Sequence, residues 1–262
     1  MTGDVTSDAS AHRNGSELTT GWLGSNRVTV VVPALDEAEN LPHVLPRIPA
    51  WVHEVVLVDD HCTDNTVEVA RQLMPDIKVV RNERPGGKGN ALRAGYEAAT
   101  GDIIVQLDAD GSEDPMEIHS FVGALLAGAD YAKGSRFIPG GGTSDMTLLR
   151  KAGNFGFVLM VRVLFGVRFT DLCYGYNAFW KRVVPLLALD ADGFEIEAML
   201  NLRAHRRGLK IAEVPSYEAD RVHGEGRLVT WPDGWRVLKT IWRERTSPLP
   251  EPQPDAALTR AA

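Results

Sequence analysis

Short apolar runs that alternate with helix-like segments constrain the fold of this chain more than any other feature. These runs occupy residues 27–33, 54–60, 77–82, 102–110 and 130–137, and the first four are rich in valine and isoleucine. The first two carry apolar residues at consecutive positions, as strands covered on both faces do. Segments with helical character and short connections separate the runs. This order predicts an α/β fold, in which helices flank a mostly parallel central sheet.

The segments between and after the runs differ in the helices they predict. Prolines in residues 36–51 predict a short or broken helix there. Longer helices are expected over residues 63–74, 87–101, 115–128, 147–166 and 194–206, followed by a strand at 209–215 and an amphipathic helix at 230–245. The last helix carries Trp231, Trp235 and Trp242 among basic residues, which suits either a membrane interface or packing of the tryptophans on the domain.

Composition limits the class of protein. The 262 residues are 44% hydrophobic and 24% charged, which argues against global disorder. The net charge of −7 argues against general nucleic-acid binding. Two cysteines without metal-ligand spacing fit a reducing cytoplasm. Since no apolar run reaches the roughly 18 to 20 residues that span a bilayer, we expect a cytoplasmic protein, attached at most to the inner face of the membrane.

The two ends of the chain differ from its middle. Residues 1–26 are polar and rich in Gly, Ser and Asp, and residues 246–262 are rich in proline. We expect both ends to be disordered tails. The remaining residues, 27–245, then form the folded domain.

Paired acids follow two of the apolar runs. Asp108 and Asp110 end the run 102–110, and in an extended segment residues two apart point the same way. Two carboxylates so close repel each other unless a cation lies between them, and Mg²⁺ or Mn²⁺ prefers such oxygen ligands. The alternative is a solvated turn with an aspartate as helix cap. Asp60 ends a neighbouring run in the same way, which favours the metal interpretation.

Two further segments are compatible with ligand binding. Asp36 and Glu37 follow the first run, where they are either ligand contacts or ordinary acids at a helix start. Glycines before Lys88 precede a predicted helix, which is a favourable place for an anion. Lys88 is then a phosphate or sugar contact, or part of a plain connecting loop.

Taken in order, these segments resemble the family 2 inverting glycosyltransferases of the GT-A fold. The matching stretches are VVPALDEAENL, VDDHCTDNT, GKGNALRAGYEAATGDIIVQLDAD, KGSRF, TDLCYGYNAF, GFEIE and RVHGEGRL, within residues 27–245. The subgroup that fits best comprises the dolichol-phosphate and polyprenyl-phosphate mannosyl- or glucosyltransferases. The resemblance implies a nucleotide-sugar half at 27–137 and an acceptor half at 138–245.

The resemblance also implies roles for individual residues. The expected contacts to a GDP- or UDP-linked sugar are Pro33, Leu35, Glu37, Val58, Asp60, Lys88, Asp108, Ala109, Asp110, Arg136, Arg221 and Arg227. Asp108 and Asp110 would hold Mg²⁺ or Mn²⁺. The catalytic set would be Asp110, Arg136 and Asp171, with Asp171 on the acceptor side. Ser112 stands where this subgroup usually has glutamine, and Asp36 where it usually has asparagine.

The acceptor decides whether the reaction needs a base. A lipid phosphate has a second pKa of about 6 and is already anionic, so it needs cations rather than a base. The candidates around the apolar segment 155–167 are Arg150, Lys151, Arg162 and Arg168. A hydroxyl acceptor would need a carboxylate such as Asp171. Glu195 and Glu197 either bind sugar hydroxyls or favour a helix dipole.

Four functions follow from these observations. The leading one is metal-dependent, inverting transfer of a mannose- or glucose-type sugar to a polyprenyl or dolichyl phosphate. The same donor chemistry on a hydroxyl acceptor is the second. The third is a nucleotide-sugar-binding protein with weak turnover, and the fourth is a nucleotidyltransferase. A nucleotidyltransferase would usually carry a Gly-rich loop after the first strand, where this chain has VVPALDEAEN.

Overall fold

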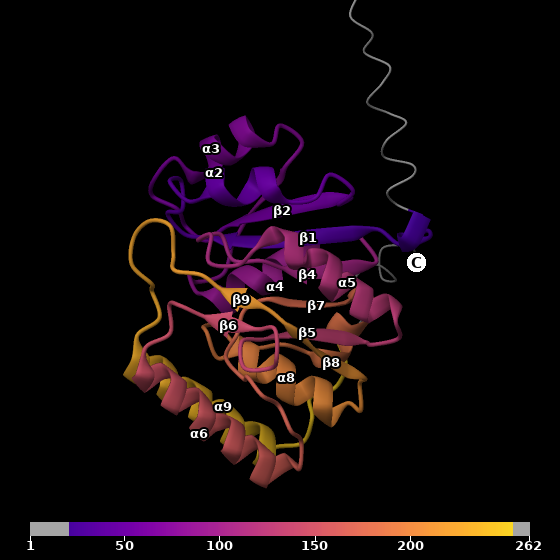
Figure 1. Cartoon of the computed structure of the whole chain (residues 1–262), viewed down its shortest axis with the longest axis vertical. Coiled ribbons are helices and arrows are strands. Elements are labelled where there is room, and N and C mark those ends of the chain that lie inside the picture. The colour runs from indigo at the N-terminus through magenta and orange to yellow at the C-terminus, as the bar shows by residue number, and fades with distance from the viewer. Residues whose placement is uncertain (1–20, 254–262) are drawn as a thin grey trace, which may run out of the picture.

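A seven-stranded sheet forms the centre of the computed structural model, which describes residues 21–253 (Figure 1). Its strand order is β3-β2-β1-β4-β7-β5-β8. The strands are β1 (Val28–Ala34), β2 (Glu54–Asp59), β3 (Lys78–Arg81), β4 (Ile103–Gln106), β5 (Tyr131–Ser135), β7 (Asn177–Trp180) and β8 (Ile211–Pro215). All neighbours are parallel except β7, which runs antiparallel to β4 and β5. The prediction of a mostly parallel sheet is confirmed.

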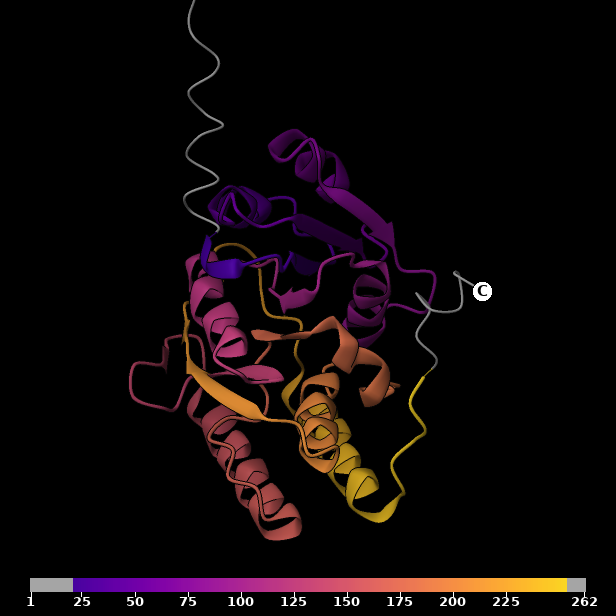
Figure 2. The same cartoon turned by 90° about the vertical axis from the view of Figure 1, so that its right-hand side faces the viewer.

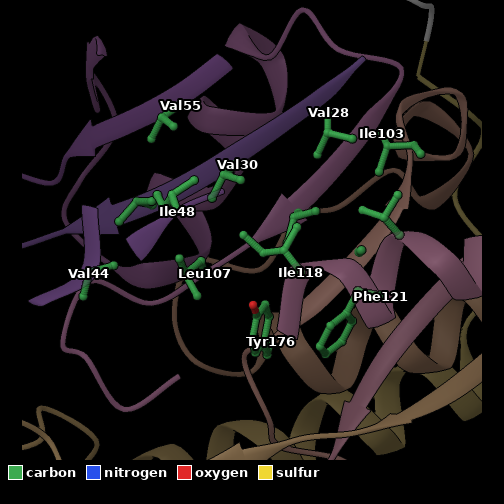
Figure 3. Packing of buried hydrophobic residues seen from close by; sticks show 14 of the residues in the cluster. Val28, Val30, Val44, Ile48, Val55, Ile103, Leu107, Ile118, Phe121 and Tyr176 are labelled. Carbon is green, nitrogen blue, oxygen red and sulfur yellow. The ribbon is translucent and has the colours of Figure 1, made fainter. Parts of the chain in front are cut away.

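Helices cover both faces of this sheet (Figure 2). One face carries α2 (Leu41–Val44), α3 (Thr66–Leu73) and α5 (Ile118–Leu126), and the other carries α4 (Lys88–Ala98) and α8 (Ile196–Arg206). Strand β1 sends Val28 and Val30 into one apolar cluster and Val31 into the other. This double burial explains why its residues from Val30 to Ala34 are all apolar. Figure 3 shows the first cluster, where Ile118 and Phe121 of α5 face the strands.

Most predicted elements are present, and three differences concern the end of β4, the strand β7 and the start of α5. The segment 36–51 is broken as expected, into α2 and the 3-10 turn η2 (Leu45–Arg47). Strand β4 ends at Gln106, four residues earlier than predicted, because its partner β7 begins opposite Gln106 at Asn177. Strand β7 itself was not predicted. A short 3-10 turn, η3 (Pro115–Glu117), precedes α5 within the predicted helix.

A smaller layer lies below the sheet in Figure 1. It contains α6 (Leu148–Phe165) and α9 (Thr230–Thr246). A separate two-stranded sheet is formed by β6 (Gly142–Thr143) and β9 (Tyr217–Glu218). Val161 of α6 and Ile241 of α9 share a third apolar cluster with Leu202 of α8. Of the helices within residues 21–253, none combines the length and apolar character needed to cross a bilayer. Two short helical segments complete the chain, η4 (Lys181–Val183) and α7 (Val184–Leu187).

Parts of both expected tails belong to the described chain. Residues 1–20 and 254–262 lie outside the described residues. The 3-10 turn η1 (Gly21–Leu23) is folded, with Leu23 buried and Trp22 edge-on to Trp51 at a ring separation of 5.2 Å. At the other end, Gln253 N donates to Pro185 O at 2.9 Å. These contacts hold Leu23 and Gln253 on the domain, and the expected boundaries of the tails stay a prediction.

Candidate active site

A cavity of about 760 Å³ opens at the carboxyl ends of β1, β2, β4 and β5. Its wall includes most of the residues expected from the sequence: Pro33, Leu35, Glu37, Asp60, Lys88, Asp108, Ala109, Asp110, Arg136, Arg221 and Arg227. Carboxyl ends of parallel strands lie at one edge of a sheet, so side chains that follow them converge. Two expected residues, Val58 and Asp171, lie outside this wall.

Val58 belongs to the core rather than to the cavity. Its side chain is fully buried in the cluster between the sheet and α4. Helix α4 comes so close that a Cβ on Gly95 would lie 2.9 Å from Val58 Cγ2. The side chain of Val58 packs against α4 and does not line the cavity, and the expected place of Val58 near the base and ribose stays a prediction.

The paired aspartates lie in the turn after β4. Asp110 Oδ1 accepts hydrogen bonds from Ser112 N at 3.0 Å and Ser112 Oγ at 2.7 Å. The backbone N of Asp108 donates to Glu113 Oε2 at 2.8 Å. Burial raises the pKa of Asp108, and the charge of Asp110 adds to this while Lys88 opposes it. Both aspartates line the cavity as expected, although a turn and not an extended strand brings them there.

Lys88 forms a buried ion-pair cluster at the start of α4. Its Nζ lies 2.8 Å from Asp108 Oδ2 and 2.7 Å from Glu197 Oε1. Burial alone would lower the pKa of Lys88, but the two carboxylates raise it well above its ordinary value. Gly87 precedes it with φ 147°, and Asp192 O would collide with any Cβ at that position. Lys88 is thus more than a connecting residue, since it neutralises two acids on the cavity wall.

Two carboxylates share Arg136 after β5. Arg136 Nε lies 2.7 Å from Asp171 Oδ2, and Nη2 lies 2.9 Å from both Asp171 Oδ1 and Cys173 O. Arg136 Nη1 donates to both oxygens of Glu218, at 2.9 and 3.0 Å. Every guanidinium nitrogen therefore donates to a protein oxygen. The expected contact between Arg136 and a diphosphate would have to replace one of these partners, and it stays a prediction.

Asp171 lies behind Arg136 with 0% of its surface exposed. Burial would raise the pKa of Asp171, but the adjacent Arg136 outweighs it and holds the pKa below its usual value. A general base has to reach its proton and accept it. In this structure Asp171 orients Arg136 and does not line the cavity, and its expected role on the acceptor side stays a prediction.

Residues 219–229 form a strap across the cavity mouth. Arg221 donates to Glu37 through Nη2 and to Asp110 Oδ2 through Nη1 at 3.2 Å. Asn40 and the backbone of His223 exchange hydrogen bonds at 2.9 and 3.2 Å. Arg227 Nη2 donates to Leu35 O at 2.6 Å. Both expected arginines thus lie over the acids that follow β1 and β4.

The acids beside β1 and β2 have different hydrogen-bond partners. Asp60 accepts from Asn82 Nδ2 at 2.7 Å and from Gly87 N at 2.9 Å, which fixes the loop before α4. Burial raises the pKa of Glu37. Asp36 accepts from Thr63 N at 2.6 Å and ties two loops together. With Cys62 and Asp64 it forms a compact group, whose possible ligand atoms lie within 4.8 Å of one another.

Four acids on the cavity wall were not predicted, and the role of Glu197 was left open. The four are Glu113, Asp145, Glu218 and Asp233. Glu113 is buried and receives the Asp108 N–H. Its position five residues after Asp108 was the available sequence signal. Glu218 follows β8 by three residues, and nothing in its neighbourhood distinguishes it from an ordinary surface acid.

The cavity continues into a groove where α6 meets the first turns of α9. Leu149, Gly153 and Phe157 contribute from α6, and Trp231, Gly234, Trp235 and Leu238 contribute from α9. Arg150 lies at the junction of the two parts, with Nη2 3.1 Å from Leu228 O. The cavity thus has an acidic end with fixed cations and an end that is mainly apolar.

The sequence profile described as "Glycosyl transferase family 2" matches residues 29–184. The chain belongs to this family. The match covers the strands that carry Glu37, Asp60, Asp108 and Asp110, as well as Arg136. As a glycosyl transferase family 2 member, the chain is a glycosyltransferase.

The names of three relatives describe the same class of reaction. The chain is 32% identical to "Polyprenol monophosphomannose synthase" of Mycolicibacterium smegmatis, over 78% of this chain and 82% of the relative. It is 31% identical to "Undecaprenyl-phosphate mannosyltransferase" of Micrococcus luteus, over 77% and 87%. A 32% match to "Dolichol-phosphate mannosyltransferase" of Pyrococcus furiosus covers 77% of this chain but only 59% of that relative.

Solved structures share the GT-A fold of the family 2 chain. One is glucosyl-3-phosphoglycerate synthase from Mycobacterium tuberculosis in complex with Mn²⁺, uridine diphosphate and glucosyl-3-phosphoglycerate. It aligns with a TM-score of 0.69 and 25% identity over 87% of this chain and 83% of that one. The same enzyme has also been solved with Mg²⁺ and uridine diphosphate, at 23% identity.

Proposed function

We propose that this chain transfers a mannose- or glucose-type sugar, with inversion, from a GDP- or UDP-linked donor to a polyprenyl phosphate. The observation that carries the proposal is the continuity of one cavity, from the acids after β4 to the apolar groove between α6 and α9. A nucleotide sugar suits the first part and an isoprenoid chain suits the second. The names of the relatives from M. smegmatis and M. luteus support this acceptor class.

Metal dependence is part of the proposal. Asp108 and Asp110 offer carboxylate oxygens to the cavity, and such hard ligands suit Mg²⁺ or Mn²⁺. In this structure Arg221 balances the negative charge of Asp110, and Lys88 balances that of Asp108. When bound, the ion would supply positive charge against the developing charge of the diphosphate. The M. tuberculosis neighbour crystallised with Mn²⁺ and uridine diphosphate supports the assignment.

Residues of the donor side would bind and orient the nucleotide. Pro33 and Leu35 offer an apolar wall for the base, with Asp60 beside them. Arg221 and Arg227 lie on the strap above the acids, where they can hold the diphosphate. The acceptor oxygen attacks the anomeric carbon from the opposite side, and the bond to the diphosphate oxygen breaks. Fixed cations around that oxygen stabilise the leaving group.

Arg150 is the cation best placed for the acceptor phosphate. Of the four basic residues expected to serve this purpose, Arg150 is the one on the cavity wall, and it lies where the acidic end meets the groove. Its ion pair with Asp145 is long, at 3.6 Å. A phosphate monoester is largely dianionic at neutral pH because its second pKa is about 6. The attack therefore needs no protein base, which agrees with the burial of Asp171.

Contact with a membrane surface would bring the lipid to this groove. Trp231, Trp235 and Trp242 of α9 are 79%, 58% and 63% exposed, so they do not pack on the domain. Helix α6 exposes an apolar stripe of Leu148, Phe155, Leu159 and Val163. Arg236, Lys239, Arg243 and Arg245 flank the tryptophans. Exposed aromatic side chains beside basic ones are typical of helices that lie in the membrane interface.

The experiment is a transfer assay with labelled GDP-mannose and UDP-glucose, Mn²⁺, and either farnesyl phosphate or 3-phosphoglycerate. We expect transfer to farnesyl phosphate that EDTA abolishes and that Asp110→Asn removes. Arg150→Met should raise KM for farnesyl phosphate, whereas Lys151→Met, outside the cavity wall, should leave it near the wild-type value. Transfer to 3-phosphoglycerate alone would overturn the lipid acceptor and favour the second candidate, a hydroxyl acceptor as in the M. tuberculosis neighbour.

A separate assay tests the membrane contact. The double variant Trp231→Ala/Trp235→Ala should lose flotation with anionic phospholipid vesicles while its far-UV circular dichroism spectrum stays unchanged. Trp180→Ala is an unsuitable control because Trp180 packs against the core. Trp22→Ala is suitable, since Trp22 is exposed and lies at the other end of the chain. Unchanged flotation of the double variant would reject the contact.

A further inference from the structure

Arg136 on the cavity wall pairs with two carboxylates, one inside the protein and one at the cavity. Asp171 is fully buried, whereas Arg136 and Glu218 both line the cavity. The open side of the guanidinium is therefore the side that Glu218 occupies. Its Nη1 lies 2.9 and 3.0 Å from the two oxygens of Glu218. One positive charge balanced against two negative ones exerts little attraction on an incoming anion.

Glu218 is held in this position by elements outside the main sheet. Its strand, β9, pairs with β6 so that Glu218 lies opposite Thr143. Thr143 Oγ1 donates to Glu218 Oε2 at 2.6 Å. The side chain of Glu218 keeps 16% of its surface exposed, compared with 0% for Asp171. Of the two carboxylates, Glu218 is the one that a ligand in the cavity can reach and replace.

We propose that Glu218 occupies, in the free enzyme, a phosphate-binding position on Arg136, and that a phosphate group of a substrate displaces it. The inference rests on the proposed function, because that function supplies phosphate-bearing substrates. Arginine binds carboxylate and phosphate oxygens with the same fork of N–H donors. A phosphate dianion offers more charge than the carboxylate it replaces, so the exchange favours phosphates over carboxylate-bearing anions.

Two substrate groups have this chemistry, the diphosphate of the donor and the monophosphate of the acceptor. Isothermal titration calorimetry with Mn²⁺ separates them. UDP and GDP report on the donor group, and farnesyl phosphate reports on the acceptor group. Glu218→Gln removes the competing charge and keeps the side-chain length. We expect at least one probe to bind about tenfold more tightly to this variant, which corresponds to about 1.4 kcal/mol.

Matched variants separate competition from a structural effect. Glu68→Gln makes the same change in charge at an exposed position on α3, outside the cavity wall, and its affinities should stay at the wild-type values. Thr143→Val loosens Glu218 without changing charge and should give a smaller gain in the same direction. Glu218→Asp restores the negative charge and should lose most of the gain. A misfolded or disordered site would weaken binding, so it cannot produce these gains.

The outcomes distinguish this inference from the function on which it rests. Tighter binding of the nucleotides to Glu218→Gln assigns the position to the donor diphosphate, and tighter binding of farnesyl phosphate assigns it to the acceptor. Equal or weaker binding of all three probes, with wild-type protein that binds them, overturns the role of Glu218 and leaves the proposed function intact. Wild-type protein that binds none of the probes overturns the proposed function itself.

Discussion

Replacing Lys88 with methionine removes the cation that two acids share. Lys88 Nζ lies 2.8 Å from Asp108 and 2.7 Å from Glu197, and the side chains of Lys88 and Glu197 are 11% and 6% exposed. Water can therefore replace little of the contact with Glu197, although Asp108, at 24% exposed, stays partly accessible from the cavity. Removing one partner of a buried ion pair costs about 3–5 kcal/mol. We expect Lys88→Met to reduce the free energy of unfolding by that amount, and the melting temperature by roughly 6 to 20 °C.

Urea unfolding near neutral pH measures this loss, with Arg84→Met as control. Arg84 pairs with Glu97 at 2.7 Å, but the two side chains are 33% and 58% exposed, and such a pair contributes about 0–1 kcal/mol. Burial raises the pKa of Asp108 and Glu197, and Lys88 counteracts it. Without Lys88 the folded state binds protons more readily, so the loss should shrink as the pH falls. Equal losses in the two variants would refute the reasoning.

Two further predictions concern packing and the response to acid. Gly95→Ala should lower the free energy of unfolding by about 1–3 kcal/mol, because its Cβ would collide with Val31. Gly123→Ala has open space around the same atom and should raise the free energy of unfolding by about 0.5–1 kcal/mol. Thermal melts of the two variants measure the difference. The lowered pKa of Asp171 means that its ionised form stabilises the fold near neutral pH and that this contribution is lost as acid protonates it. Asp171→Asn should therefore differ most from wild type near neutral pH, and acid titrations of both proteins should converge; a constant difference would contradict this.

The main sheet could be predicted because most of its strands have a local sequence signal, which is a short run of apolar residues. Strand β1 is apolar at consecutive positions, and its residues divide between two cores. Strand β7 could not be predicted in the same way. Asn177–Trp180 is only four residues long, and its antiparallel direction depends on the path by which the chain returns to β4 and β5. The same pairing ends β4 at Gln106, so the error in β4 follows from the missing strand.

The candidate site divides along a similar line. Glu37, Asp60, Asp108 and Asp110 could be placed together because parallel strands end at one edge. The partner of each acid could not be predicted, since Lys88 and Glu197 are 109 residues apart. Sequence identifies residue types, but ion pairing depends on which side chains the finished fold brings within about 4 Å.

The strap over the cavity also affects the order in which the parts of the cavity become available during synthesis. Asn40 bonds to a residue 183 positions later, Glu37 to one 184 positions later, and Leu35 to one 192 positions later. A ribosome synthesises the acids early and their arginine partners late. A nascent polypeptide shorter than 221 residues carries Glu37 and Asp110 without Arg221 between them. The cavity therefore becomes complete only after Arg221 and Arg227 have been synthesised, which is later than every strand of the main sheet.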